Sequence, residues 1–202
     1  MDSEYRSCFD NCIGALDGIH VLAHVLAEEA SSYRNRKSAL TQNVLAVVTF
    51  DVQFYHVLVG WEGSAYDERV MKDAEVRGFR APEGKKWLAN AGNPNSDLYL
   101  ASYRGTRHHL REQALANLGP DNKEELFDKR HSSSRSVVER PFGVLKQRVW
   151  WFDCGWPYTI EIQVQVVYAL TVLHNFIRWL ESDSEDIFYT VEKEAKQQRA
   201  PD

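Results

Sequence analysis

The stretch Cys12-Ile-Gly-Ala-Leu-Asp-Gly-Ile-His20 decides the expected fold, because an apolar, β-branched run meets an Asp-Gly pair within it. The apolar residues predict a strand that starts near Cys12 and leads into Asp17. Asp17 is therefore an acid placed at the end of a buried strand.

Further elements follow at spacings that fit one sheet with covering helices. Two apolar runs, 43–50 and 54–61, predict a strand pair joined by a short turn. A helix is expected over 65–76, with Asp67 near its start, because acids stabilise the N-terminus of a helix. A short strand then ends at Asn90.

The second half of the chain is expected to be mainly helical. Residues 104–130 are polar with scattered leucines and predict a mixed insertion. Apolar spacing over 132–150 predicts a helix that Pro141 either kinks or begins, because proline has no N–H to donate. The strongest helix covers 160–180, with an apolar stripe at Ile162, Val166, Leu170, Leu173 and Ile177. Residues 183–202 predict an acidic, loosely ordered tail.

Strands followed by helices, with acids at strand ends, predict a single α/β domain over residues 1–182. With 202 residues, 44% of them hydrophobic and 26% charged, the chain is long enough to bury one core. No run of about 18 apolar residues appears, so we expect no membrane-spanning segment.

Charge is unevenly distributed along the chain, whose net charge is −5. The acidic total argues mildly against a dedicated nucleic-acid binder, because phosphate contacts come from lysine and arginine. Residues 129–148 nevertheless contain six basic side chains and one acid, Glu139. This basic stretch is either a phosphate-facing surface or a solvated helix face, and composition alone leaves both readings open.

Five blocks in order resemble the PIF/Harbinger family of DDE transposases and the nucleases derived from them. The blocks are Cys12–His20; Gln42-Asn-Val-Leu-Ala46 with Phe50-Asp51; Gly60–Val70; Leu88–Ser96 with Tyr103–Leu110; and Arg135–Lys146, closed by Leu173-His-Asn-Phe176. They cover nearly the whole chain.

The resemblance implies an RNase H-like fold, in which helices flank a mixed sheet and a polar insertion precedes the helix of the catalytic glutamate. It also implies a nuclear, DNA-directed nuclease. Such enzymes cut and join phosphodiesters with two divalent ions, Mg²⁺ or Mn²⁺, held by carboxylates.

The resemblance assigns the site residue by residue. Asp17 matches the first catalytic ligand, Glu139 the last, and Asp67 an acid that assists as a metal ligand. Asn90 stands where the family has its second aspartate. Because asparagine offers a carbonyl oxygen but no negative charge, we expect weakened metal binding and little or no turnover. A structural alternative is that Asn90 caps the turn at 92–94.

Other polar side chains have both a functional and a structural interpretation. His20 either reaches the site or packs on its strand, and His108-His109 either contacts phosphate or lies in a solvated loop. His174 is expected to be a hydrogen-bonded core residue. The aromatic cluster around Cys154 is expected to be core or an interface patch.

Three functional hypotheses remain open. The first is a transposase-derived nuclease domain that is now impaired, and the second is a non-enzymatic module that binds chromatin proteins or a Myb-like partner. In the third, Asp67 substitutes for the lost carboxylate and the nuclease still works. The chain starts almost at the first-aspartate block, so we expect weak DNA binding through 129–148 alone, recognition through a partner, and a nuclear location that becomes cytoplasmic without that partner.

Overall fold

The computed structural model of the chain describes residues 9–92, 95–103, 120, 122–149, 152 and 156–181. Its strands are β1 (Cys12–Leu22), β2 (Thr41–Thr49), β3 (Phe54–Glu62), β4 (Lys86–Ala89) and β5 (Tyr99–Ala101). They form one sheet in the order β3-β2-β1-β4-β5. The β1–β2 and β2–β3 pairs are antiparallel, whereas the β1–β4 and β4–β5 pairs are parallel. The predicted α/β class with a mixed sheet is confirmed.

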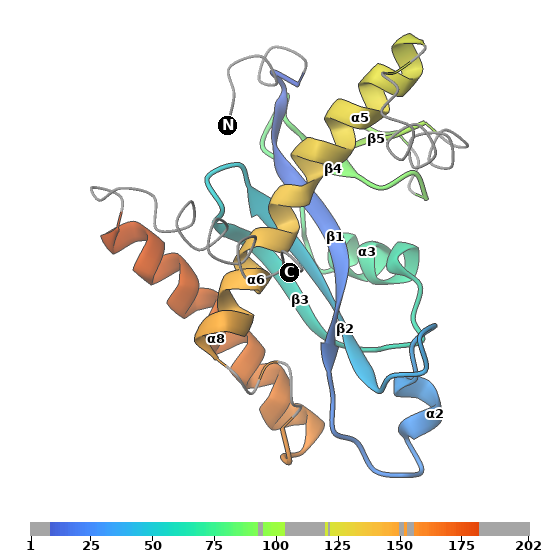
Figure 1. The fold of residues 1–202 in the computed structure, drawn as a ribbon, viewed down its shortest axis with the longest axis vertical. Helices are drawn as coiled ribbons and strands as arrows, with labels where there is room; N and C mark the ends of the chain where they lie inside the picture. The colour runs from blue at the N-terminus through green and yellow to red at the C-terminus, as the bar shows by residue number, and fades with distance from the viewer. Residues whose placement is uncertain are drawn as a thin grey trace, which may run out of the picture.

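Helices cover both faces of this sheet. They are α2 (Ala30–Tyr33), α3 (Asp67–Val76), α5 (Lys123–Arg135), the 3-10 helix η1 (Ser136–Val138), α6 (Glu139–Arg148) and α8 (Ile160–Leu180). In Figure 1, α5, η1 and α6 follow one another across one face, with α8 beside them, and α3 lies behind the sheet. Each face has its own apolar core, because successive side chains of a strand point to opposite faces.

The central strand β1 differs from its expected form. A strand ending at Asp17 is wrong, because β1 continues to Leu22 and pairs with β2 throughout, from Gly14 opposite Thr49 to Leu22 opposite Thr41. The parallel pairing with β4 reaches only Ala15. It is therefore the end of β4, and not the end of β1, that leaves one side of β1 uncovered around Asp17.

The helical segment from α5 to α6 corrects two expectations. The predicted insertion over 104–130 is wrong in part, because α5 begins at Lys123, and residues 104–119 lie outside the described part. The buried side chains of α5 are all polar, so apolar spacing does not reveal it: Glu125, Asp128, His131 and Ser134. α6 begins two residues before Pro141, directly after η1. Pro141 therefore lies in the first turn, where a missing N–H is tolerated.

Helix α8 has the predicted bounds but a different buried face. Its buried side chains are Gln163, Val167, Thr171 and His174, whereas Ile162 and Leu173 of the predicted stripe are exposed. Gln163 bonds both the N–H and the carbonyl of His24, at 3.1 and 2.6 Å. The stripe prediction failed because this helix docks on backbone groups through polar side chains.

The same helix fixes the hairpin turn between β2 and β3. Asn175 accepts from the Phe54 N–H and donates to the Phe54 carbonyl, both at 2.8 Å. His174 is 2% exposed and donates through Nε2 to the Val52 carbonyl at 2.9 Å, which confirms its predicted core role. Val52 has φ +62°, a strained value for a β-branched residue. The His174-Asn175 pair thus holds the turn.

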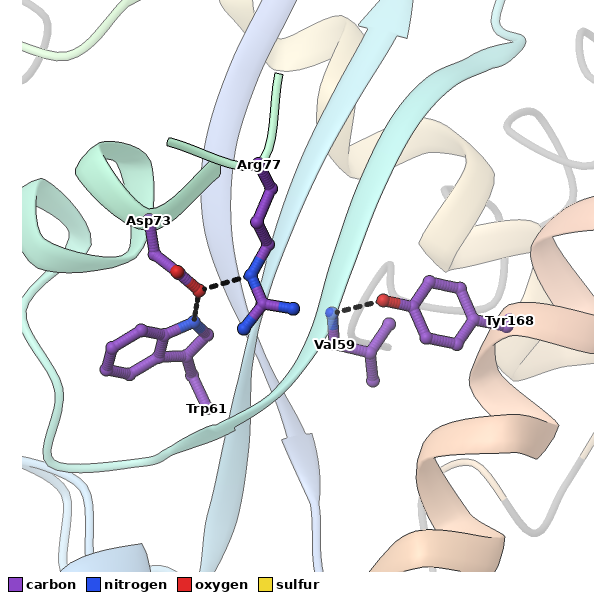
Figure 2. Close-up of polar contacts among 5 residues, drawn as sticks. All are labelled: Val59, Trp61, Asp73, Arg77 and Tyr168. Carbon is purple, nitrogen blue, oxygen red and sulfur yellow. Dashed lines mark hydrogen bonds and ion pairs between the residues drawn. The ribbon is translucent and has the colours of Figure 1, made fainter. Parts of the chain in front are cut away.

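Strand β3 is an edge of the sheet, and side chains cover it from both sides (Figure 2). The Val59 N–H donates to the Tyr168 hydroxyl of α8 at 3.2 Å. On the α3 side, Asp73 accepts from Trp61 Nε1 at 3.1 Å and from Arg77 Nε at 2.9 Å. The Tyr168 hydroxyl thus satisfies one backbone N–H of this edge strand.

By length and composition alone, α8 is apolar enough to cross a membrane, and it is the one such helix in the described part of the chain. Polar residues interrupt its apolar run and dock the helix, and the expectation that no segment of the chain spans a membrane stays a prediction. In the structure α8 packs along β3.

Replacing Asn175 with alanine is expected to lower the free energy of unfolding by about 2 kcal/mol, because two backbone bonds to Phe54 are lost. Urea denaturation measures the change. Gln165→Ala on the exposed side of α8 is the matched control and should change stability by less than about 0.5 kcal/mol. Equal effects of the two variants would contradict the proposed role of Asn175.

Stability is expected to fall as the pH is lowered from 7.5 to 5. Burial lowers the pKa of His174 and of His131 below the ordinary value, so the unfolded chain takes up protons first. The loss starts near pH 6.5, with at most about 1.4 kcal/mol per pH unit for each histidine. Urea titrations at several pH values should show a flatter profile for His174→Gln and an unchanged one for His24→Gln. An unchanged profile for His174→Gln would be the contrary result.

Candidate functional site

The site is built around Asp17, in the middle of β1. Its neighbours Ala15 and Ile19 pack in the core under α6 and α8, so the Asp17 side chain points to that face as well. Gly18 and His20 point to the α3 face. The Asp17 side chain is 19% exposed, and Oδ1 accepts from the Gly18 N–H at 3.2 Å.

Asn90 follows β4 directly and is aligned with Asp17. Ala15 lies opposite Leu88, and continuing that parallel register by two residues places Asn90 beside Asp17 on the same face. This continued register supports the predicted pairing of the two residues, and their role in one site stays a prediction. Asn90 Oδ1 accepts from the Gly92 N–H at 3.0 Å, so the predicted turn cap is confirmed for this residue.

Glu139 begins α6 and is exposed. The preceding helix η1 packs on β1 and β2 through the buried Val137 and Val138, so α6 starts over the face to which Asp17 points. Glu139 is thus delivered to the predicted side of the sheet, and its catalytic role stays a prediction.

Arg135 is the residue that the sequence reasoning missed. It ends α5, and its Nη1 donates to Asp17 Oδ2 in an ion pair whose arginine side chain is 13% exposed. Burial raises the pKa of Asp17, while Arg135 and the Gly18 N–H favour its charged form. One signal was present in the sequence: Arg135 precedes Glu139 by four residues, which places both on one side of a helix.

Asp67 lies on the other face of the sheet. A Cβ added at Gly18 would lie 2.2 Å from Asp67 Oδ1, so this carboxylate sits against the bare Gly18 backbone. Asn43 Nδ2 donates to the same oxygen at 3.0 Å. Asp67 therefore fastens the start of α3 to β1 and β2, and a role as a metal ligand stays a prediction.

Of the remaining candidates, His20 lies within the described residues, on the face opposite Asp17. His20 as a whole residue is exposed, and its Nδ1 lies 3.0 Å from Thr41 Oγ1 on the α3 face. Partial removal of its ring from water lowers the pKa of His20. His108-His109, Cys154 and the 183–202 tail lie outside the described residues.

A two-metal centre needs several carboxylates close together. Within the described ranges, no group of three or more His, Cys, Asp or Glu residues lies close enough to hold an ion. Asp17 forms an ion pair with Arg135, and the Asn90 side chain is uncharged. The residues as they stand do not fit a two-metal site.

The sequence matches the model of the DDE superfamily endonuclease family over residues 16–175. "Protein ALP1-like" of Arabidopsis thaliana is 25% identical over 91% of this chain and 47% of its own length. "Putative nuclease HARBI1" of Homo sapiens is 28% identical over 81% of this chain and 45% of its own length. The chain thus spans about half the length of these relatives. No solved structure gives a significant match.

The mixed five-stranded sheet with helices on both faces defines an α/β domain. The family match covers most of the chain, and the chain belongs to the DDE superfamily endonucleases. The resemblance to the Harbinger transposase-derived nucleases is confirmed by the two relatives.

Gly18→Ala is expected to lower the free energy of unfolding by roughly 3 kcal/mol, because the new methyl group overlaps the Asp67 carboxylate. Adding Asp67→Ala removes the overlap, so the double variant should lose less than the sum of the single changes. Urea denaturation measures both.

Gly143→Ala in α6 is the control, since an added Cβ meets nothing within 4 Å there, and it should stabilise slightly. Additive effects of the Gly18 and Asp67 changes would show that the two residues do not touch.

Proposed function

We propose that this chain is a DNA-directed nuclease domain with an RNase H-like fold whose cleavage is impaired because Asn90 replaces the second aspartate. The ancestral reaction is metal-dependent cutting and joining of DNA. The observation that carries this proposal is the parallel register of β1 and β4, which points the residue after β4, Asn90, towards Asp17, beneath the helix that begins with Glu139.

The sheet supports the RNase H-like assignment. Its first three strands are antiparallel and its last two are parallel, in the order β3-β2-β1-β4-β5, with helices on both faces. The parallel register of β4 with β1 supports a site shared by Asp17 and Asn90, which are distant in the chain.

Charge explains why cleavage is impaired. DDE endonucleases use divalent ions held by carboxylates, and Mg²⁺ prefers charged or carbonyl oxygens. Asn90 removes one negative charge, and its oxygen is already engaged by Gly92. The remaining acids are Asp17, which is paired with Arg135, and Glu139.

The basic stretch supports a weak contact with DNA. Lys129, Arg140 and Lys146 are exposed on α5 and α6, the helices that border Asp17. Exposed lysines and arginines beside a nuclease site suit phosphate groups. We propose a nuclear location and recognition of specific DNA through a Myb-like or chromatin partner.

A second candidate function is a non-enzymatic interaction module. It is favoured by the outer side of α8, where Val172, Phe176 and Trp179 are 68%, 54% and 67% exposed. Apolar side chains gathered on a surface mark many protein–protein contacts. The third hypothesis, a working nuclease that uses Asp67, is disfavoured because Asp67 sits on the opposite face from Asp17.

Asn90→Asp is expected to restore divalent-metal-dependent nicking of supercoiled plasmid, by at least about tenfold over the unmodified chain. The added carboxylate returns the lost charge beside Asp17. Adding Glu139→Gln should abolish the gain, and chelation of the metal should do the same.

The proposal is contradicted if the unmodified chain already nicks plasmid and Asp67→Asn abolishes this activity. Asp67 would then act as a catalytic carboxylate in place of residue 90. A folded Asn90→Asp variant that fails to cut under every metal tested would favour the interaction module.

A further inference from the structure

The ion pair between Arg135 and Asp17 crosses from the end of α5 to the middle of β1. Both side chains are largely buried, at 13% and 19% exposure. Oδ2 of Asp17 accepts from Arg135, and Oδ1 accepts from the Gly18 N–H. Each carboxylate oxygen of Asp17 therefore has a donor from the protein itself.

The position of Arg135 is fixed by the docking of α5 on the far strand of the sheet. His131 Nε2 donates to the Leu100 carbonyl of β5 at 2.9 Å. Asp128 Oδ1 accepts from the Tyr103 N–H at 2.9 Å. His131 lies one helical turn before Arg135, so these bonds hold the guanidinium over Asp17.

Residue 90 adds no charge to the ion pair of Asp17 and Arg135, and the Asp17 carboxylate also feels the negative charge of Asp67. Asp17 carries one negative charge, Arg135 one positive charge, and Asn90 none. An aspartate at position 90 would leave one carboxylate without a counter-charge, and two adjacent carboxylates ionise together only beside additional cations.

We propose that Arg135 is a built-in counter-ion that neutralises Asp17 and competes with divalent metal ions for it. The inference rests on the proposed function, because it concerns the same carboxylate. It goes beyond the proposed function, because it assigns to Arg135 the role of keeping divalent metal ions from the Asp17 carboxylate. Removing one partner of a buried ion pair strongly destabilises the folded protein, because the other charge is left unpaired. Removing both partners lowers the stability of the protein much less.

The test uses Mn²⁺ alone as the probe and the full chain as the protein. Binding is measured from the loss of the free Mn²⁺ electron paramagnetic resonance signal and from the Mn²⁺-dependent rise in Tm. The variants are Asn90→Asp, Arg135→Gln, and both together. The double variant is expected to bind Mn²⁺ at least about tenfold more tightly than Asn90→Asp alone, because a cation next to the ion has been removed.

Controls separate the site from general charge effects. Lys129→Gln removes an exposed charge from the same helix and should leave Mn²⁺ binding by the Asn90→Asp variant unchanged. Arg135→Lys retains the charge and should also leave it unchanged. Adding Asp17→Asn to the double variant should abolish Mn²⁺ binding.

Stability provides a second readout without metal. Arg135→Gln is expected to lower Tm by roughly 10 °C, and Arg135→Gln with Asp17→Asn should restore most of that loss. If the Arg135→Gln/Asn90→Asp variant does not fold alone, Mn²⁺ added during refolding should recover its circular dichroism spectrum.

The proposal is overturned if the double variant binds Mn²⁺ no more tightly than Asn90→Asp, or if an unfolded double variant does not respond to Mn²⁺. DNA cleavage has no part in this assay. A double variant that binds Mn²⁺ but cuts no DNA would refute the proposed nuclease function and leave the role of Arg135 standing.

Discussion

A carboxylate in the middle of the central strand, largely removed from water, is the constraint around which this structure is arranged. Asp17 is four-fifths buried because β1 pairs with β2 from Gly14 to Leu22 and is covered by helices on the face that Asp17 points to. A buried charge of this kind needs a partner. Arg135 supplies it, and α5 is docked on β5 in the position that allows it to do so.

The two faces of β1 have separate tasks. On the α3 face, Gly18 leaves room for the Asp67 carboxylate, which ties α3 to the sheet through Asn43. On the other face, Asp17 meets the end of β4 and the end of α5. Asp67 and Asn43 thus join α3 to the sheet, whereas Asp17 and Asn90 belong to the candidate site.

The elements with apolar alternation or apolar spacing could be predicted from the sequence. β2, β3, α3, β4 and α8 lie close to their expected ranges, since each has a pattern that one face of a core requires. The alignment of Asp17 with Asn90 depends on strand order, which the family resemblance implied. α5 and the buried side of α8 could not be found in this way, because polar side chains dock them on backbone groups. Arg135 was missed for a different reason, because its partner Asp17 lies 118 residues away in the chain.

The protein itself, through Arg135, supplies the counter-charge that Asp17 needs. A crystal structure of the unmodified chain grown with Mn²⁺, with anomalous data collected at the manganese edge, tests this role of Arg135. We expect Arg135 to contact Asp17 and no anomalous peak to lie within bonding distance of the Asp17 carboxylate. A manganese peak on Asp17, with Arg135 turned away, would contradict it.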